Sequence, residues 1–541
     1  MEIENIERLD HHGIVAGTIR ELGLIEMIDE RLGKHDDESI SAGEAIAGMI
    51  INGLGFSDRP LSLIPQFFNE CPLDSLFDRH LDPDDFNRFK LGRVLDRAAT
   101  YGCDLLFTEL AQRAARKIGI DTRFGHLDTT SFSVTGEYLP DTDENAISIT
   151  YGYSKDKRPD LKQAVLEMMV SQDGGIPLIA KSWDGNSSDN VIFGERSKYL
   201  ADQLSKADWP EFLVADSKLY TKENTDFLES VAYITRIPNT IKNAVELINT
   251  ALAEKNSWIS VSPSRKYQTF NLNHYGISQR WIVVYSQEAE NRSRSSYEKK
   301  VQREKDLISK DLFHLQAKRF SCKEDAHSAL YEKSKKWKYH LLGSVEYREY
   351  EKYAKKGRPS RGTHPETMTF QITATTTKNK DLLESKIRSA ACYIVGTNAD
   401  RDVLSDTEAI SNYSQQNQVE KGFRFLKDPI FFASSLFVKK PSRISGLLMV
   451  MSLALLVYSV AERQLRKTLQ EKEETLPNQI NQPTKTPTLR WVFQILRGIN
   501  VITVNEDGFR QRIFKGINEL RRKILSMFSE KILSIYQISL T

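Results

Sequence analysis

Between residues 124 and 237 the sequence carries a series of short apolar segments, and this series constrains the fold more than any other feature. The segments are rich in β-branched and aromatic residues and are bounded by turn residues such as Gly174-Gly175, a pattern typical of strands. The predicted strands are Phe124–Val134, Ala146–Tyr153, Ala164–Val170, Ile176–Lys181, Phe212–Asp216 and Ala232–Ile237, with a helix at Thr221–Ser230. Strands followed by a strand–helix–strand unit indicate a mixed sheet flanked by helices, so we expect an α/β core.

A chain of 541 residues is too long for one hydrophobic core, so we expect several folding units. Helical periodicity runs through the N-terminal part, and further helices are predicted at Leu489–Arg497 and Phe509–Ser534. The predicted units are an all-helical N-terminal domain for DNA-end binding or dimerisation at 1–118, the first part of the core at 119–238, an inserted domain of strands and charged helices at 239–389, the second part of the core at 390–470, and a linker with C-terminal helices at 471–541.

The net charge of +2 hides an uneven distribution. Residues 1–120 hold 13 lysine and arginine residues against 22 aspartate and glutamate residues, a balance of −9. Residues 436–541 hold 17 basic and 8 acidic residues, a balance of +9. A basic C-terminal part fits a polyanionic partner. In the acidic N-terminal domain we expect only local DNA contacts, for example from the Arg88–Arg97 segment.

Several features favour a cytoplasmic protein. The four cysteines form no CxxC pair, which argues against a zinc site and a disulfide framework. The first residues lack the basic and then apolar pattern of a signal peptide. The apolar segment Ile444–Val460 has 17 residues, at the short limit for crossing a bilayer, and is predicted to be a buried core helix.

His11 and His12 are neighbours in the sequence. A metal site is not expected there, since no third ligand lies near them, and both are instead predicted to lie at the surface.

Two acids stand directly at strand ends. Asp128 follows the apolar start of the first predicted strand, and Asp216 ends the short strand that begins at Phe212. A carboxylate beside a buried strand is costly unless it is paired or bound to a cation. Carboxylates are ligands of Mg²⁺, and two such ions can activate an attacking oxygen and stabilise a leaving one. A turn or helix-cap acid explains each residue equally well when it is taken alone.

The stretch Tyr413–Lys427 reads as an amphipathic helix. Its spacing places a phenol, an amide, one acid and two cations on one face, and these residues are Tyr413, Gln416, Glu420, Arg424 and Lys427. Val419, Phe423 and Leu426 mark the opposite, buried face. The first face suits a polyanion held beside a metal. A solvated helix face is the more common explanation of such a pattern taken alone.

Four ordered blocks resemble those of a bacterial insertion-sequence transposase of the DDE class, in the broad insertion sequence four superfamily. The blocks are His126-Leu-Asp-Thr-Thr-Ser131, Gly152–Gln163, Gly185-Asn-Ser-Ser-Asp189 and Val214–Tyr220. The helix at 413–427 is similar to the signature Tyr-x2-Arg-x3-Glu-x6-Lys of that superfamily. Tyr413, Glu420 and Lys427 match it in register, and Gln416 stands where the signature has arginine.

The resemblance implies a ribonuclease H-like core interrupted by an insertion domain, with Asp128, Asp216 and Glu420 holding two Mg²⁺ ions and Mn²⁺ as a substitute. It implies cleavage at the terminal inverted repeats, followed by attack of the freed 3′-hydroxyl on target DNA. Tyr413, Lys427 and the residue at position 416 would contact phosphates. A homodimer on DNA is expected because two ends are paired, in the bacterial cytoplasm with the nucleoid and without membrane contact.

Other basic residues are weaker candidates for DNA binding. Arg424 lies one turn beyond Glu420 and is expected to supply the cation that Gln416 lacks. Lys155, Lys157 and Arg158 could hold the DNA backbone or form a solvated turn. Lys356-Gly-Arg-Pro359 resembles the core of an AT-hook, with Arg358 in a minor groove, although an exposed charged loop explains it as well.

Three alternatives stay open. One is another ribonuclease H-like nuclease, such as a resolvase, and the second is a catalytically inactive DNA-binding protein derived from a transposase. The Gln416 departure keeps the second alternative in play. A structural helical scaffold accounts for the N-terminal part but not for two acids at strand ends.

Overall fold

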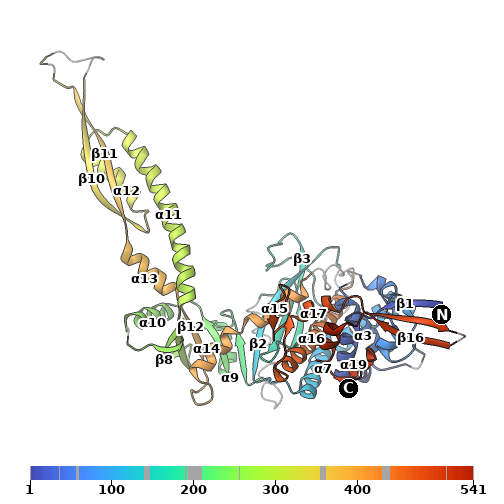
Figure 1. Cartoon of the computed structure of the whole chain (residues 1–541). Coiled ribbons are helices and arrows are strands. Elements are labelled where there is room, and N and C mark those ends of the chain that lie inside the picture. Colours follow the sequence, from blue (N-terminus) through green and yellow to red (C-terminus); the bar gives the residue numbers. More distant parts are fainter. Residues whose placement is uncertain are drawn as a thin grey trace. The chain divides into compact units, whose positions relative to one another are not determined.

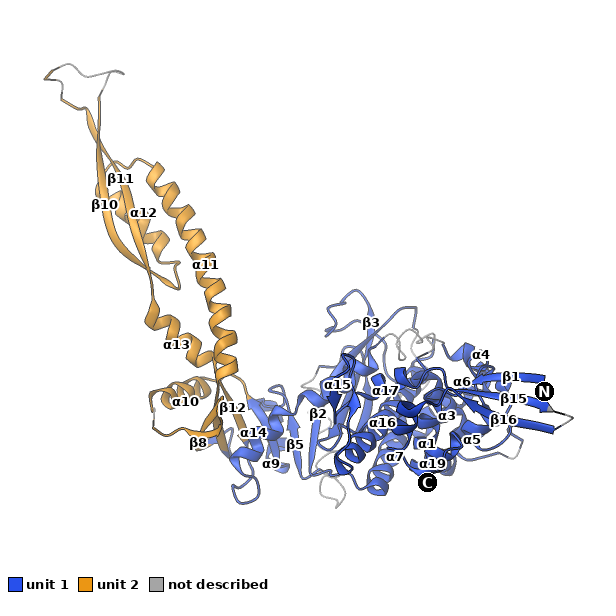
Figure 2. Ribbon diagram, in the orientation of Figure 1, with its two compact units in different colours: residues 1–236, 273–279, 397–541 blue, residues 237–272, 280–396 orange. Residues whose placement is uncertain are grey.

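The structure is a computed structural model, and Figure 1 shows the whole chain. The chain divides into two compact units (Figure 2), of which the first comprises residues 1–236, 273–279 and 397–541 and the second residues 237–272 and 280–396. The residues that the structure describes are 2–35, 37–56, 60–138, 146–188, 192, 210–254, 256–353, 361–362, 364–428, 439–506 and 509–539. The five-part division made from the sequence stays a prediction.

The first unit contains a mixed sheet with the strand order β4-β3-β2-β5-β6. The strands are β2 Phe124–Val134, β3 Lys162–Ser171, β4 Pro177–Trp183, β5 Phe212–Ala215 and β6 Tyr233–Ile237. β2, β3 and β4 pair antiparallel, whereas β2, β5 and β6 pair parallel. Almost every residue of β3 and β5 is buried, as expected for strands covered on both faces. This confirms the predicted α/β core with a mixed sheet.

Helices pack on this sheet at two places. α7 (Cys103–Ile118) and α16 (Pro441–Glu471) contact β4, and α15 (Asn417–Leu426) contacts β2 and β3. α16 contains the predicted core helix and is long and apolar enough to cross a membrane by length and composition only. Because 89% of its most apolar window is buried, packing inside the protein accounts for its apolar character.

The N-terminal part is mainly helical, but the prediction that residues 1–118 are all helical is wrong. Residues Glu2–Arg8 form strand β1, which pairs with β15 (Asn500–Glu506) in a three-stranded sheet of order β1-β15-β16. The other elements before α7 are α1 His12–Leu22, α2 Leu24–Leu32, α3 Ala42–Leu54, η1 Leu61–Leu63, α4 Ile64–Phe68, α5 Leu73–Phe77, η2 Pro83–Phe86 and α6 Arg88–Tyr101. β1 is mostly exposed, so it lacks the apolar alternation that reveals a strand.

The C-terminal part also corrects a prediction. The expected helix Phe509–Ser534 is instead strand β16 (Phe509–Lys515) followed by α18 (Glu519–Leu525) and α19 (Glu530–Ile535). β16 pairs antiparallel with β15, where Val501, Ile502, Thr503 and Val504 are β-branched and favour a strand. The preceding helix α17 (Leu489–Ile495) is found where it was predicted, and two short strands, β13 Leu476–Pro477 and β14 Pro483–Thr484, lie in the linker.

His11 and His12 are buried, which overturns their expected surface position. His11 Nε2 lies 2.8 Å from the carbonyl oxygen of Leu54, and its ring stacks on Phe493 at 4.1 Å between centroids. Burial lowers the pKa of His11 well below its usual value and that of His12 to about 4. Both imidazoles are therefore neutral at pH 7 and fill the core as flat, weakly polar rings.

One predicted strand of the first unit is not formed. Ala146–Tyr153 makes a single antiparallel bridge, between Thr150 and Gln163, and no continuous ladder. Gly185 comes so close that a Cβ on Gly152 would lie 2.1 Å from the Gly185 carbonyl oxygen. Because the backbone of Gly185 lies against Gly152, the segment cannot continue beside β3 at the regular distance between paired strands.

In the second unit, β12, β9, β8 and β7 lie in that order, and a separate hairpin joins β10 to β11. The strands are β7 Ile259–Ser262, β8 Arg265–His274, β9 Ile277–Ser286, β10 His340–Lys352, β11 Thr367–Lys378 and β12 Cys392–Thr397, and the helices are α10 Lys242–Ala253, α11 Gln287–Ala317, α12 Lys323–Ser334 and α13 Lys380–Ala390. β10 was not predicted, because most of its side chains are exposed or only half-buried and many are charged.

Candidate active site

The pairing of β2 with β5 places Asp128 beside Asp216. The two strands run parallel, and the last paired residues are Leu127 and Ala215. Each aspartate is the next residue along the chain, so the two hold equivalent positions on neighbouring strands about 4.8 Å apart. Asp216 follows the end of β5, whereas Asp128 stays within β2, where it pairs with Met168 of β3, so the prediction that Asp128 ends its strand is wrong. Both aspartates are half-buried, whereas the residues before them are buried. Two carboxylates held this close repel one another unless a cation lies between them.

The surroundings of Asp128 supply part of that positive charge. Its Oδ1 accepts a hydrogen bond of 2.7 Å from the backbone N–H of Thr129 and lies 3.7 Å from Lys155 Nζ. Lys155 also donates to the Thr129 hydroxyl at 2.6 Å and to the Thr129 carbonyl oxygen. The ammonium group is therefore held by Thr129 on β2, and its positive charge lies beside the carboxylate of Asp128.

Backbone contacts fix Asp216 where β5 ends. Its Oδ1 accepts a 2.9 Å hydrogen bond from the N–H of Lys218, which closes a short turn. Its carbonyl oxygen accepts a 2.8 Å hydrogen bond from the hydroxyl of Thr235 on β6. Asp216 therefore does stabilise a turn through its Oδ1. The other carboxylate oxygen takes no part in that turn.

Glu420 lies in the first turn of α15. The predicted helix 413–427 is interrupted at Gln415–Gln416, so that Tyr413 belongs to α14 (Asp406–Ser414) and the expected single face is split between two helices. Within α15 the predicted pattern is confirmed, because Val419, Phe423 and Leu426 are buried while Glu420 and Arg424 are exposed. Glu420 and Arg424 thus remain on one exposed side of α15, and Tyr413 is half-buried on α14.

Gln416 connects this helix to β2. Its Nε2 donates a 2.9 Å hydrogen bond to the carbonyl oxygen of Leu127, and its Oε1 lies 3.2 Å from Nδ1 of His126. Since a carbonyl oxygen can only accept, the amide nitrogen must face Leu127 and the amide oxygen must face His126. His126 Nδ1 therefore carries the hydrogen. At the arginine position of the signature this chain uses an amide to attach the Glu420 helix to β2, one residue before Asp128.

His126 is fully buried on the same face of β2 as Asp128, two residues away. Burial lowers the pKa of His126 to about 4, so the ring is neutral at pH 7. Its Nε2 meets no hydrogen-bond partner within the described ranges. His126 belongs to one of the sequence blocks that carry the resemblance, but no role was predicted for it. Its position two residues before Asp128, on one side of a strand, was the signal that could have found it.

The remaining predicted DNA-binding residues lie in different settings. Lys427 Nζ pairs with Asp156 at 2.7 Å and lies over the ring of Phe132, which ties the end of α15 to the segment after Gly152. Arg158 pairs with Asp160 at 2.7 Å, and Lys157 is exposed in the left-handed region with φ of 60°. Arg358 falls outside the described residues.

The structure does not gather three metal ligands. Among the described residues, no group of three or more histidine, cysteine, aspartate or glutamate side chains converges on one point. The register of β2 and β5 brings Asp128 and Asp216 together, and Glu420 stays on the exposed face of α15. The residue types fit Mg²⁺, which prefers carboxylate oxygens and keeps several water ligands. The arrangement supplies the two aspartates of such a site, and Glu420 must approach them for the set to be complete.

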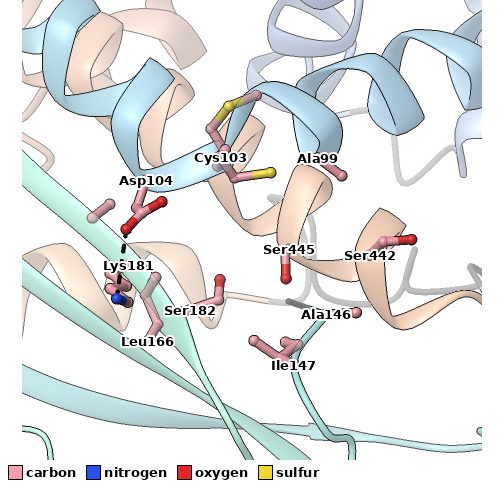
Figure 3. A pocket seen from close by; sticks show the side chains of 13 residues that line it. Ala99, Cys103, Asp104, Ala146, Ile147, Leu166, Lys181, Ser182, Ser442 and Ser445 are labelled. Carbon is pink, nitrogen blue, oxygen red and sulfur yellow. Dashed lines mark ion pairs between the residues drawn. The ribbon is translucent and has the colours of Figure 1, made fainter. Parts of the chain in front are cut away.

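The acids do not line the cavity shown in Figure 3. This cavity of about 310 Å³ lies between the start of α7, β4 and α16, and an ion pair of 3.6 Å joins Asp104 to Lys181 at its wall. Burial raises the pKa of the Cys103 thiol to about 12, so the thiol stays protonated and is a poor nucleophile. Its chemistry offers no second candidate for an active site.

Comparisons with known proteins add little to this geometry. A family model described as "Domain of unknown function (DUF4277)" matches residues 4–112. No curated protein matches the chain. Among solved structures, the cryo-EM structure of a piggyBac transposase synaptic complex with hairpin DNA is similar at 8% sequence identity and a TM-score of 0.35, over 90% of this chain and 79% of that chain. A score this low does not establish a shared fold.

Proposed function

We propose that this protein is a DDE transposase of a bacterial insertion sequence, which cleaves DNA at the element's ends and joins the freed 3′-hydroxyl to target DNA. The observation that carries the proposal is the placement of Asp128 and Asp216 directly after the last paired residues of the parallel strands β2 and β5. The resemblance of the ordered sequence blocks to such transposases is the second support. The strand order β4-β3-β2-β5-β6, with three antiparallel strands followed by two parallel ones, resembles that of ribonuclease H-like sheets.

In the proposed mechanism Asp128, Asp216 and Glu420 hold two Mg²⁺ ions, for which Mn²⁺ can substitute. When bound, such ions activate the attacking oxygen and stabilise the leaving oxygen of an in-line displacement at phosphorus. The protein's own residues position the acids. Gln416 holds the start of α15 against β2 at Leu127, four residues before Glu420.

Cations near the acids would bind the DNA phosphates. Lys155 lies beside Asp128, and in the proposed complex it neutralises a phosphate oxygen next to the bond that is cut. Arg424 is exposed one helical turn from Glu420, where it can reach the same strand. Tyr413 and Lys427 are proposed to contact phosphates on either side, and Lys427 would have to exchange its ion pair with Asp156 for one with DNA.

The experiment is a cleavage and strand-transfer assay with the full chain on DNA that carries the inverted repeats flanking its gene. We expect cleavage that needs Mg²⁺ and stops in EDTA. Asp216→Asn should lower the rate about a thousand-fold or more, because charge stabilisation by metal is worth several kcal/mol and each 1.4 kcal/mol is tenfold. Asp226→Asn, which changes an exposed acid in the first turn of α9 (Thr225–Ser230), is the matched control.

The outcomes separate the alternatives. Cleavage without strand transfer would favour another ribonuclease H-like nuclease. Tight DNA binding with no metal-dependent cleavage would favour an inactive, transposase-derived DNA-binding protein. Cleavage that survives in Asp216→Asn would overturn the assignment of the site.

A further inference from the structure

A groove lies in the first unit where the first turns of α6 and α16 approach one another. It has a volume of about 540 Å³ and is lined by Arg88, Phe89 and Arg93 of α6, by Lys439 and Arg443 at the start of α16, and by η1. Neither Asp128, Asp216 nor Glu420 lines it. The groove is thus a separate feature from the proposed active site.

The groove has a surplus of positive charge. Arg443 is held by Asp96 through two hydrogen bonds of 2.6 and 2.7 Å, so its charge is largely balanced. Arg88, Arg93 and Lys439 are exposed, and none of them forms an ion pair with any residue in the described parts of the chain. The described residues that line the groove include no acid. Three unbalanced cations around one concave surface attract an anion, even though residues 1–120 as a whole are acidic.

An aromatic ring stands among these cations. Phe89 exposes 64% of its surface, although a ring of this size is normally buried. The guanidinium carbon of Arg88 lies 4.8 Å from its centroid. An exposed ring beside unpaired cations suits a ligand that offers both an anionic group and a flat apolar face. A nucleotide in a strand has this combination, since its phosphate binds cations and its base stacks on an aromatic ring.

The floor of the groove is formed by a glycine and two buried leucines of α6. A Cβ on Gly92 would lie 2.9 to 3.2 Å from the guanidinium atoms of Arg443, so the glycine lets this side chain lie flat against α6. Leu91 and Leu95 lie on the same wall and are buried. The groove therefore combines an ordered base with a charged rim.

We propose that this groove binds a single-stranded stretch of the DNA substrate, with phosphates on Arg88, Arg93 and Lys439 and one base stacked on Phe89. A base can stack on Phe89 only when its face is free, which excludes the interior of an intact duplex. The inference rests on the proposed function, because it takes the partner to be DNA. It adds a strand-binding site away from the three acids.

The test measures binding of fluorescein-labelled single-stranded and duplex oligonucleotides to the full chain in EDTA by fluorescence anisotropy, over a series of salt concentrations. For Arg88→Ala/Arg93→Ala we expect affinity for the single strand to fall about tenfold or more at 0.1 M salt. The slope of log K against log salt should flatten by roughly 1.4, about 0.7 for each lost phosphate contact to a single strand. The matched cation control is Lys515→Ala on β16, which is also exposed.

Phe89→Ala should weaken single-strand binding about five- to hundredfold without changing the salt slope, because stacking releases no counterions. Phe89→Trp should restore binding, and duplex affinity should change little in either variant. Phe509→Ala, which removes an 80% exposed ring on β16, is the control. Thermal unfolding of each variant confirms that the chain is folded.

Wild-type affinity and slope in the groove variants, or equal losses in the controls, would overturn the inference while leaving cleavage by the acids intact. The inference would also be overturned if only an acidic polypeptide displaced DNA from the groove and Phe89→Ala left single-strand binding unchanged. Groove-dependent binding without any metal-dependent cleavage would instead overturn the proposed transposase and leave the groove in place. A wild-type chain that binds no DNA would overturn both.

Discussion

At the scale of single residues, the exposed cations of α15 differ in their distance from the proposed chemistry. Arg424 is one turn beyond Glu420 on the same side of the helix, whereas Lys421 is displaced around it. We predict that Arg424→Ala lowers the cleavage rate about tenfold, since a charge-assisted hydrogen bond to phosphate contributes about 1.5–3 kcal/mol. Lys421→Ala should have a smaller effect. Equal cleavage by wild type and Arg424→Ala in single-turnover assays would contradict this role.

Gln416 joins two segments that are 290 residues apart in the sequence, through His126 and Leu127. We predict that Gln416→Ala lowers the free energy of unfolding by about 1–3 kcal/mol, because it leaves a buried imidazole N–H and a carbonyl oxygen without their partner. It should also lower cleavage by loosening α15. Chemical denaturation measures the first effect, and Gln418→Ala, whose amide makes only 3.4 Å contacts, is the control. An unchanged free energy of unfolding in Gln416→Ala would show that this contact does not stabilise the fold.

The contact between Gln416 and His126 also marks a limit of what the sequence could predict about the site. Asp128 and Asp216 could be located because each follows an apolar segment with a recognisable strand pattern. The His126–Gln416 contact could not, because no local pattern encodes a hydrogen bond between distant segments. The break at Gln415–Gln416 was missed for a related reason. Both residues are compatible with a helix, and the interruption coincides with the tertiary contact of Gln416 on β2.

At the scale of elements, most of the buried strands were predictable, whereas several exposed strands were not. β2, β3 and β5 have apolar runs that only a covered strand explains, and all three were found as predicted. β1, β10 and β16 lie in small sheets whose side chains are mostly exposed or half-buried, so their residues alternate weakly or carry charge. Their strand character comes from pairing with a partner strand, and helical periodicity was the wrong guide to Phe509–Ser534.

Contact between α2 and α3 depends on one small residue. A Cβ on Gly43 would lie 2.2 Å from the carbonyl oxygen of Ile25, and its N–H donates a 2.7 Å hydrogen bond to Asp29. We predict that Gly43→Ala lowers the free energy of unfolding by about 1–3 kcal/mol, because backbone must move to admit the methyl group. Gly446→Ala in α16 should cost less, since its nearest neighbour is the side chain of Leu95 at 3.1 Å, which can rotate. Denaturant unfolding that ranks the two variants in the opposite order would contradict this.

At the scale of the whole molecule, neutral histidines are built into the core at separate places. His11 packs between Leu54 of α3 and Phe493 of α17, and His12 packs against Phe67 of α4. His126 lies in the sheet, two residues before Asp128. Burial lowers the pKa of all three below the value of about 6.5 that applies in the unfolded chain. Between pH 4 and 6.5 the unfolded state therefore binds more protons than the folded state.

The sign of the pH dependence follows from this difference. Stability contributed by the neutral rings is fully present above pH 6.5 and is lost as the pH falls below it. For His12 or His126, with a folded pKa of about 4, the loss between pH 7 and pH 5 is about 2 kcal/mol each. Carboxylates whose pKa values are lowered by ion pairs, such as Asp173 beside Arg463, lose their contribution only at lower pH, below about 3.8. The histidines thus dominate the mildly acidic range.

We therefore predict that the free energy of unfolding, measured by denaturant titration, falls steeply from pH 7 to pH 5. His126→Gln should be less stable at pH 7, because the buried site is shaped for an imidazole, yet its stability should depend less on pH by about 2 kcal/mol over this interval. His314→Gln, at an exposed position of α11, is the control. A pH dependence that His126→Gln does not reduce would mean that the ring is protonated in the folded protein. In that case Nδ1–H would still donate to Gln416, because both ring nitrogens of an imidazolium carry a hydrogen, but the ring would no longer make the stability of the fold fall with pH.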